Sequence, residues 1–288
     1  MLKGKYLVLA SVTPYAVDHI IYFFYNKLDL ESIRNTIEEI LKKHSKYVSD
    51  CESADWNSLC RDDMAYIGVE VLPFEGEGYA YIMFDRKLQS LKSFSTITAV
   101  SVENLKRYRA KRITIDIDNS EDYVAGLAIY KLYKIYGIRI SRVVKTERGF
   151  HIVGESDDEL PLISRLVIRE ELGDDASRLN YDKILISNGL GYLAEILFDY
   201  KWWRGEQNFH KWIDIPLDRI PVAIPVNDIR FPEGFRIQLR KGFAEFATYT
   251  WFRNGQQMET YLAVFHGYSV EEAEKILRKV VERVRSII

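Results

Sequence analysis

Cysteine is scarce in this 288-residue chain, which contains only Cys51 and Cys60. The two could form one disulfide, although a reduced pair is the usual state in the cytosol. Together with His44 they lack both the CxxC spacing and an evident fourth ligand of a zinc site. We therefore predict no structural zinc, and the pairing of the two cysteines stays open.

Long apolar runs and targeting signals are also missing. No apolar stretch reaches the roughly 18 residues of a membrane-spanning helix. The apolar run near the N-terminus is too short, and its flanks are too polar, for a signal peptide. We expect a cytoplasmic protein that has no membrane partner.

No internal repeat, low-complexity tract or Pro/Gly-rich linker marks a domain boundary. The P-loop pattern G-x-x-x-x-G-K-[ST] is absent, so the sequence contains no P-loop NTPase motif. Hydrophobic residues make up 47% and charged residues 28%, as in soluble globular proteins. The formal net charge is -2, so nucleic-acid binding would need a local basic surface. Abundant Ile, Tyr, Lys and Glu favour a thermophilic source.

Residues 1–105 predict an N-terminal α/β module. Apolar spacing predicts a strand at 5–11 and helices at 14–28 and 30–44. Two alternating runs, 69–73 and 79–85, flank a turn-rich FEGEG segment and predict a hairpin.

The last quarter of the chain predicts a second hairpin and a final helix. Asn254-Gly255 lies between the alternating runs 243–252 and 258–265, which is a strong hairpin signal. A capping box that begins at Ser269 predicts the start of a helix over 270–288. Its apolar stripe is expected to be a core or docking face and comprises Ile276, Val280, Val284 and Ile287.

The middle of the chain predicts a β-α-β-β-α-β unit of the ferredoxin-like or RRM type. The expected strands are 112–118, 138–145, 149–154 and 181–187, and the expected helices are 121–137 and 160–172. Many functions share this order, so the chemistry must come from particular residues on it.

Two carboxylates on the first of these strands are the main chemical signal. Thr114, Asp116 and Asp118 share one face of 112–118, because side chains alternate along a strand. The two Asp Cα atoms would be about 7 Å apart at a rise of roughly 3.3 Å per residue. Like charges so placed favour a cation, and Mg²⁺ binds through one or two carboxylates plus substrate phosphates. The alternative is a pair of solvated carboxylates at a strand end.

The expected topology brings other polar residues to the same place. In a ferredoxin-like sheet the strand order is 4-1-3-2, and strands 3 and 4 are antiparallel to strand 1. Asp118 ends strand 1, His151 opens strand 3, and Asp182 would open strand 4. The three residues should therefore converge, which favours a site over isolated charges.

These residues carry a family resemblance that spans about 110–200. Asp116-Ile117-Asp118, then Thr146…Gly149-Phe150-His151, then Tyr181-Asp182 resemble the three motifs of the archaeo-eukaryotic primase superfamily. The stretch from Arg169 through Gly173-Asp174-Asp175 and Arg178 is similar to that of primase–polymerases of archaeal plasmids and viruses. Thr146 lies five residues before His151, whereas family members often have a Ser or Thr two residues before it.

The resemblance implies an α+β fold, with an N-terminal α/β module (1–105) and an RRM-like catalytic palm with the C-terminal hairpin and helix (106–288). It implies a template-directed DNA primase/polymerase that acts in the replication of a plasmid, virus or mobile element. Its partners would be single-stranded DNA template, nucleoside triphosphates and a separate helicase.

The implied site holds two Mg²⁺ or Mn²⁺ ions on Asp116, Asp118 and Asp182, which would be the catalytic carboxylates. His151, with Arg148 and Thr146, would bind the triphosphate of the incoming nucleotide. Asp174 and Asp175 compete with Asp182 as the third carboxylate, although Gly-Asp-Asp before a strand also favours a turn.

Basic residues interleaved with aromatics suggest where nucleic acid would bind. Arg107, Arg109 and Lys111 belong to a basic run around Tyr108, which suits backbone contact plus base stacking. The alternative is a solvated flank. The stretch 198–204 has a similar character, although its Trp pair could equally belong to the core.

Two other functions compete with a polymerase. A glycosyltransferase also uses D-x-D, but it gives no role to His151 or Asp182 and expects a doubly wound sheet. The other alternative is not an enzyme: a primase-like accessory subunit or an RRM-type nucleic-acid binder. RRM binders need aromatics on strands 1 and 3, whereas strand 1 here presents carboxylates.

Overall fold

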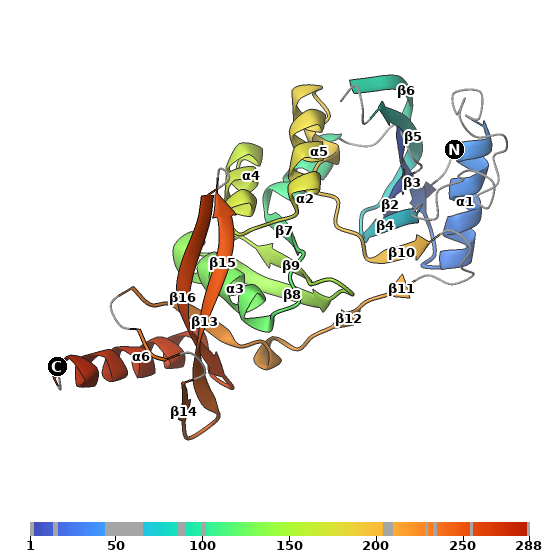
Figure 1. Cartoon of the computed structure of the whole chain (residues 1–288). Coiled ribbons are helices and arrows are strands. Elements are labelled where there is room, and N and C mark those ends of the chain that lie inside the picture. Colours follow the sequence, from blue (N-terminus) through green and yellow to red (C-terminus); the bar gives the residue numbers. More distant parts are fainter. Residues whose placement is uncertain are drawn as a thin grey trace. The chain divides into compact units, whose positions relative to one another are not determined.

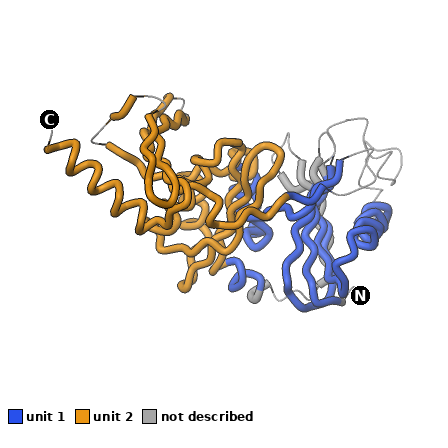
Figure 2. The backbone as a smooth tube through the Cα atoms, turned by 90° about the horizontal axis from the view of Figure 1, so that it is seen from below, with its two compact units in different colours: residues 1–109, 180–212 blue, residues 110–179, 213–288 orange. Residues whose placement is uncertain are grey.

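The computed structural model describes residues 3–13, 17–43, 66–85, 90–98, 102–203, 210–227, 230–232, 235–253 and 256–286. These residues form a mixed α+β fold with six α-helices and three antiparallel sheets (Figure 1). The chain separates into two compact units (Figure 2). Unit 1 comprises Met1–Arg109 and Asn180–Trp212, and unit 2 comprises Ala110–Leu179 and Ile213–Ile288.

Unit 1 is built on one antiparallel sheet, whose main path runs β1-β5-β3-β2-β4-β10-β11, with β6 paired to β5. The strands are β1 (Lys3–Gly4), β2 (Tyr6–Thr13), β3 (Val17–Tyr25), β4 (Tyr66–Leu72), β5 (Gly76–Asp85), β6 (Ser90–Thr98), β10 (Tyr200–Trp203) and β11 (His210–Lys211). The helices in its N-terminal part are α1 (Leu30–Lys43) and α2 (Val102–Ala110). The predicted strand at 5–11 and helix at 30–44 are thus confirmed as β2 and α1.

The helix predicted at 14–28 is wrong, because its described residues 17–25 form strand β3. β3 lies between β5 and β2, and its side chains enter a different apolar core on each face. Ile21 and Phe23 belong to the core beneath α1, whereas Ile20 and Phe24 belong to the core on the opposite face. A strand buried on both faces is apolar throughout, so its periodicity does not distinguish it from a buried helix.

The hairpin predicted over 69–85 is also wrong, although both of its strands exist. β4 pairs with β2 and β10, whereas β5 pairs with β1, β3 and β6. The segment between them therefore crosses the sheet rather than closing a hairpin. Short alternating runs specify strands, but they do not specify which neighbour each strand takes.

A polar pair is buried inside unit 1. His19 on β3 and Tyr81 on β5 are 1% and 0% exposed, and His19 Nδ1 lies 2.8 Å from the Tyr81 hydroxyl. Burial lowers the pKa of His19 from its ordinary 6.5 to about 4, because the interior disfavours the charged ring. The same desolvation raises the pKa of the Tyr81 hydroxyl. Both side chains are therefore neutral in the folded protein at pH 7.

We expect the free energy of unfolding to fall as the pH is lowered from 6.5 to about 4. In this window the unfolded chain protonates His19 and the folded chain does not, so stability rises with pH. The steepest contribution is about 1.4 kcal/mol per pH unit. Denaturant unfolding at several pH values checks this, with His19→Gln as the variant that removes the titration. Identical pH slopes for the two proteins would contradict the assignment.

Unit 2 contains two four-stranded sheets. The first has the order β12-β8-β9-β7, and its strands are β7 (Arg112–Ile117), β8 (Arg139–Lys145), β9 (Phe150–Glu155) and β12 (Ile213–Asp214). The second has the order β13-β16-β15-β14, and its strands are β13 (Val222–Pro225), β14 (Arg236–Gln238), β15 (Phe243–Arg253) and β16 (Gln256–His266). The remaining helices are α3 (Asp122–Tyr136), α4 (Leu162–Glu171), α5 (Ala176–Ser187) and α6 (Val270–Arg285). Helix α5 crosses the boundary between the two units.

The predicted β-α-β-β-α order is confirmed over residues 112–171, and the neighbour order β7-β9-β8 is the predicted 1-3-2. The sixth element is wrong: residues 181–187, expected to be strand 4, are the second half of helix α5. The physical reason is a cap that the prediction missed. Asp175 Oδ1 accepts a hydrogen bond of 2.7 Å from the Arg178 backbone N–H, which is typical of a helix N-cap.

The C-terminal elements match their predictions. β15 and β16 pair continuously from Phe243↔His266 to Arg253↔Gln256, while Asn254-Gly255 and Ile287 lie outside the described residues. Ser269 caps α6 in a capping box with Glu272. Ile276 packs against the core of the second sheet. Among the described helices, none combines the length and apolar character needed to cross a membrane.

Candidate functional site

Strand β7 separates an apolar face from a polar one. Ile113, Ile115 and Ile117 are at most 2% exposed and join a core that includes residues of α3 and α4. Asp116 alternates with them, and its side chain is 28% exposed. Asp118 follows the end of the strand and is exposed. The predicted division of the strand is therefore present, with Asp116 on the face away from the apolar core.

His151 lies directly opposite Asp116 on the neighbouring strand β9. The ring nitrogen Nε2 is 3.4 Å from Asp116 Oδ1, and the His151 side chain is only 6% exposed. The main-chain bonds of Asp116 point to the other edge of β7, so this is a non-hydrogen-bonded pair, in which side chains approach closely. The structure thus brings together the carboxylate and the imidazole that the sequence placed on adjacent strands.

A tight turn between β8 and β9 delivers His151 to this position. The Gly149 N–H donates to Thr146 Oγ1 at 2.9 Å, and the Thr146 N–H donates to the Gly149 carbonyl at 2.9 Å. A Cβ on Gly149 would lie 1.7 Å from the Ile117 carbonyl oxygen, so only glycine allows this approach to β7. The Thr146 hydroxyl therefore has a structural role in the turn, and Arg148 is exposed there.

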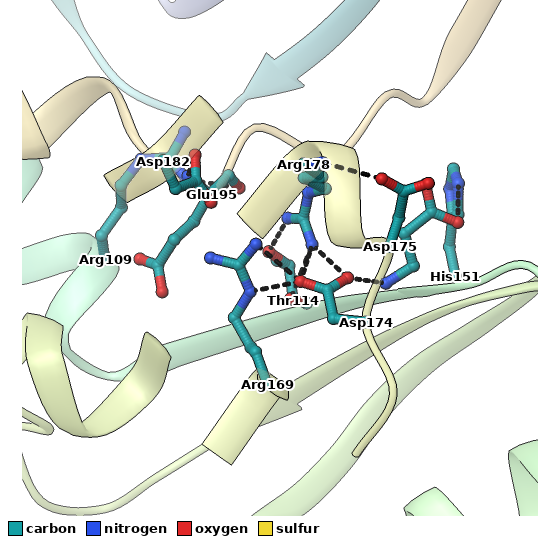
Figure 3. Close-up of polar contacts among 10 residues, drawn as sticks. Arg109, Thr114, His151, Arg169, Asp174, Asp175, Arg178, Asp182 and Glu195 are labelled. Atoms are coloured by element: carbon teal, nitrogen blue, oxygen red, sulfur yellow. Dashed lines mark hydrogen bonds and ion pairs between the residues drawn. The ribbon is translucent and has the colours of Figure 1, made fainter. Parts of the chain in front are cut away.

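The outer edge of β7 is covered by the segment that joins α4 to α5. Asp174 Oδ1 accepts a 2.7 Å hydrogen bond from the Asp116 N–H, and the Asp175 N–H donates to the Asp116 carbonyl at 2.8 Å. Arg178 Nη1 donates to the Thr114 carbonyl at 3.0 Å. Figure 3 shows Asp174 between Arg169 and Arg178, with Thr114 alongside. The sequence analysis did not predict that this segment bonds to β7. Asp175 as the N-cap of a helix was the signal that could have indicated it.

Asp174 and Asp175 have different surroundings. Asp174 is 5% exposed, and its carboxylate bonds to Arg169 (2.7 Å to Nε) and to Arg178 (2.9 and 3.0 Å to Nη1). This carboxylate is neutralised by two guanidinium groups, so it is poorly suited to bind a metal. Asp175 is half-buried and caps α5 through one oxygen. Of the two competing residues, Asp175 is the better candidate for a third acidic ligand.

Asp182 lies on helix α5, so the prediction that it opens a strand is wrong. It is 2% exposed, and its Oδ1 accepts a 3.0 Å hydrogen bond from the Glu195 N–H within unit 1. Glu195 has a positive φ of 68°, which is unusual for a residue other than glycine. In this setting Asp182 holds the backbone of residue 195.

The residues predicted to contact nucleic acid differ in their exposure. Arg109 is 4% exposed; it donates to Glu70 Oε2 at 2.8 Å and to the Glu195 carbonyl at 2.9 Å. Its guanidinium is therefore part of the interior of unit 1. Arg107 and Lys111 are exposed, as the prediction requires.

The second basic–aromatic stretch is partly interior. Trp202 is fully buried and stacks with the guanidinium of Arg34, 3.8 Å from the ring centroid. Lys201 lies 3.9 Å from the ring centroid of Tyr66 and 4.4 Å from that of Trp203. One Trp of the pair thus packs in the core, and Arg204 lies outside the described residues.

The carboxylates at the end of β7 fit a divalent ion by their chemistry. Asp116 and Asp118 offer the oxygen donors that Mg²⁺ and Mn²⁺ prefer, and neither carboxylate is fully buried. Within the described part of the chain, no group of three His, Cys, Asp or Glu side chains is arranged to hold a metal ion. In general, Mg²⁺ binds through one or two carboxylates and completes its shell with waters or substrate phosphates.

Comparison of the chain with protein-family models, curated proteins and solved structures gives no match.

Proposed function

We propose that this protein is a nucleotidyltransferase of the primase–polymerase type, in which Asp116 and Asp118 bind catalytic Mg²⁺ or Mn²⁺. The observation that carries the proposal is the pairing of Asp116 with His151 across β7 and β9. A carboxylate and an imidazole on one polar sheet face, followed by a second carboxylate at the strand end, suit the binding of a metal–triphosphate complex.

We assign the role expected of Asp182 to Asp175. Its backbone N–H is bonded to the Asp116 carbonyl, so the two residues belong to one local arrangement. His151 offers a ring nitrogen for a phosphate oxygen, and the exposed Arg148 in the adjacent turn offers a guanidinium. Metal ions bound here would neutralise phosphate charge and lower the pKa of an attacking 3′-hydroxyl. The protein's own part is to orient the carboxylates and the triphosphate.

The proposed substrates are nucleoside triphosphates and a single-stranded DNA template. Arg107 and Lys111 are exposed cations that suit contact with the template backbone. A role in the replication of a plasmid, virus or other mobile element, with a separate helicase, is part of the same proposal.

The test is synthesis on single-stranded DNA with labelled nucleotides and Mn²⁺, with and without a primer. We expect template-dependent incorporation that chelation of the metal abolishes. Hydrolysis of nucleotide-sugars in a parallel assay, without incorporation, would favour a glycosyltransferase. DNA binding that is indifferent to Mn²⁺, without incorporation, would favour a non-catalytic nucleic-acid-binding subunit.

A further inference from the structure

The segment 174–178 forms hydrogen bonds to the outer edge of β7 where a neighbouring strand would otherwise pair. In the described part of the chain, β7 has one strand neighbour, β9. Three main-chain groups on the other edge are bonded to the segment 174–178: the Thr114 carbonyl, the Asp116 N–H and the Asp116 carbonyl. They bond respectively to Arg178 Nη1 (3.0 Å), Asp174 Oδ1 (2.7 Å) and the Asp175 N–H (2.8 Å). The main-chain N–H and the main-chain carbonyl of Asp116 are thus both bonded to one short segment.

The groups that hold this edge are themselves fixed. Asp174 accepts from Arg178 as well as from Asp116, and its other oxygen lies 2.6 Å from Arg169 Nη2. The side chains of Arg169 and Asp174 are both 0% exposed, and that of Arg178 is 12% exposed. Charge-assisted bonds among buried planar groups have a narrow geometry and little freedom to rearrange. A flexible surface contact could not define the position of Asp116 in this way.

We propose that Arg178 and Asp174 are positioning residues, which set the direction of the Asp116 carboxylate by holding its backbone. Arg178 also connects Asp116 with Asp175, two of the acidic residues of the proposed site. Its side chain bonds to Asp174, which holds Asp116, while its main-chain N–H bonds to Asp175 Oδ1 at 2.7 Å. Loss of the guanidinium would remove the bond to the Thr114 carbonyl and one of the two cations that hold Asp174, which accepts from the Asp116 N–H. This inference rests on the proposed function, because it takes these carboxylates as metal ligands.

Ordinary edge protection predicts something different from positioning. If Arg178 only covers a strand edge, its loss lowers thermal stability, and the protein that stays folded keeps its metal affinity and turnover. If it positions Asp116, both properties fall in fully folded protein. Outer groups that orient metal ligands typically contribute 10–100-fold to metal affinity or activity.

The test compares Arg178→Gln and Arg178→Lys with the wild type and with Arg236→Gln. Arg236 is a suitable control, because it lies in the same unit and pairs with Glu245 while 60% exposed. Three properties are measured well below the melting temperature: Mn²⁺ affinity by electron paramagnetic resonance of the free ion, kcat for incorporation, and the fraction folded by circular dichroism. We expect Arg178→Gln to weaken Mn²⁺ binding about 10-fold and to lower kcat about 100-fold. Mn²⁺ affinity and kcat of Arg178→Lys should lie between those of the wild type and of Arg178→Gln. One ammonium keeps the charge but cannot reproduce the several fixed donors of the guanidinium.

Wild-type Mn²⁺ affinity and kcat in folded Arg178→Gln would overturn the positioning role. A wild type that binds Mn²⁺ but incorporates no nucleotide would refute the polymerase activity alone; weaker Mn²⁺ binding by Arg178→Gln would then still support positioning. A wild type that binds no Mn²⁺ would overturn both proposals.

Discussion

We expect replacement of Asp116 by alanine to abolish the proposed nucleotide incorporation and to leave the protein folded. The carboxylate faces His151 on the polar side of the sheet, whereas its main-chain bonds to Asp174 and Asp175 do not need the side chain. Loss of a metal ligand removes several kcal/mol of charge stabilisation, so we expect kcat to fall by about 10³-fold or more. The measurement is steady-state incorporation with Mn²⁺, together with a thermal melt. Asp118→Ala should behave in the same way.

Asp157→Ala is the matched control for this experiment. Asp157 is a carboxylate beyond the other end of β9, and it pairs with Arg139 in a contact in which both side chains are largely exposed. Its loss should leave incorporation unchanged. If Asp116→Ala incorporates nucleotide at the rate of Asp157→Ala, the metal-site hypothesis is wrong.

We expect Asp174→Ala to lower the free energy of unfolding by about 3–5 kcal/mol, because it removes one member of the buried ion pair between Asp174 and Arg169. The same change removes the acceptor for the Asp116 N–H. Most single substitutions destabilise a protein by less than this, and the whole free energy of unfolding of a globular protein is only about 5–15 kcal/mol. Denaturant unfolding monitored by circular dichroism gives the value.

A double variant tests the cause of that loss. Arg169→Met in the Asp174→Ala background removes the buried cation that had paired with Asp174 and keeps apolar bulk, so part of the stability should return. Asp157→Ala again serves as control, since exposed ion pairs contribute at most about 1 kcal/mol. An Asp174→Ala protein as stable as this control would show that the buried pair is not needed for stability.

Part of the site could be predicted because it depends on side-chain alternation and on short connections between strands, which are local properties of the sequence. Alternation in residues 112–118 assigns the isoleucines to one face and Asp116 to the other, and the structure agrees. The predicted ferredoxin-like topology makes the third strand antiparallel to the first, so the start of β9 was expected beside the end of β7, and the structure agrees. The sequence therefore predicted His151 beside Asp118 at the end of the strand, whereas the register that places it opposite Asp116 is known only from the structure.

The errors fall where several elements compete for the same residues. Residues 181–187 are apolar enough for a strand, but a cap at Asp175 and burial along the helix favour α5. Asp182 is consequently part of a helix and not the start of a strand, and Asp174 and Asp175 of the preceding segment bond to the β7 edge. Arg109 was expected at a basic surface and instead neutralises the buried Glu70.

The sequence by itself determined the strands, helices and polar face of the 112–171 region, because side-chain periodicity and short connections are local properties. Only the tertiary structure decided which acidic residue stands beside Asp116, and which arginines hold it. A buried charge is stable only beside an opposite charge, and that partner can come from a distant part of the sequence. The ion pairs of Asp174 with Arg169 and of Arg109 with Glu70 therefore become known only from the folded structure.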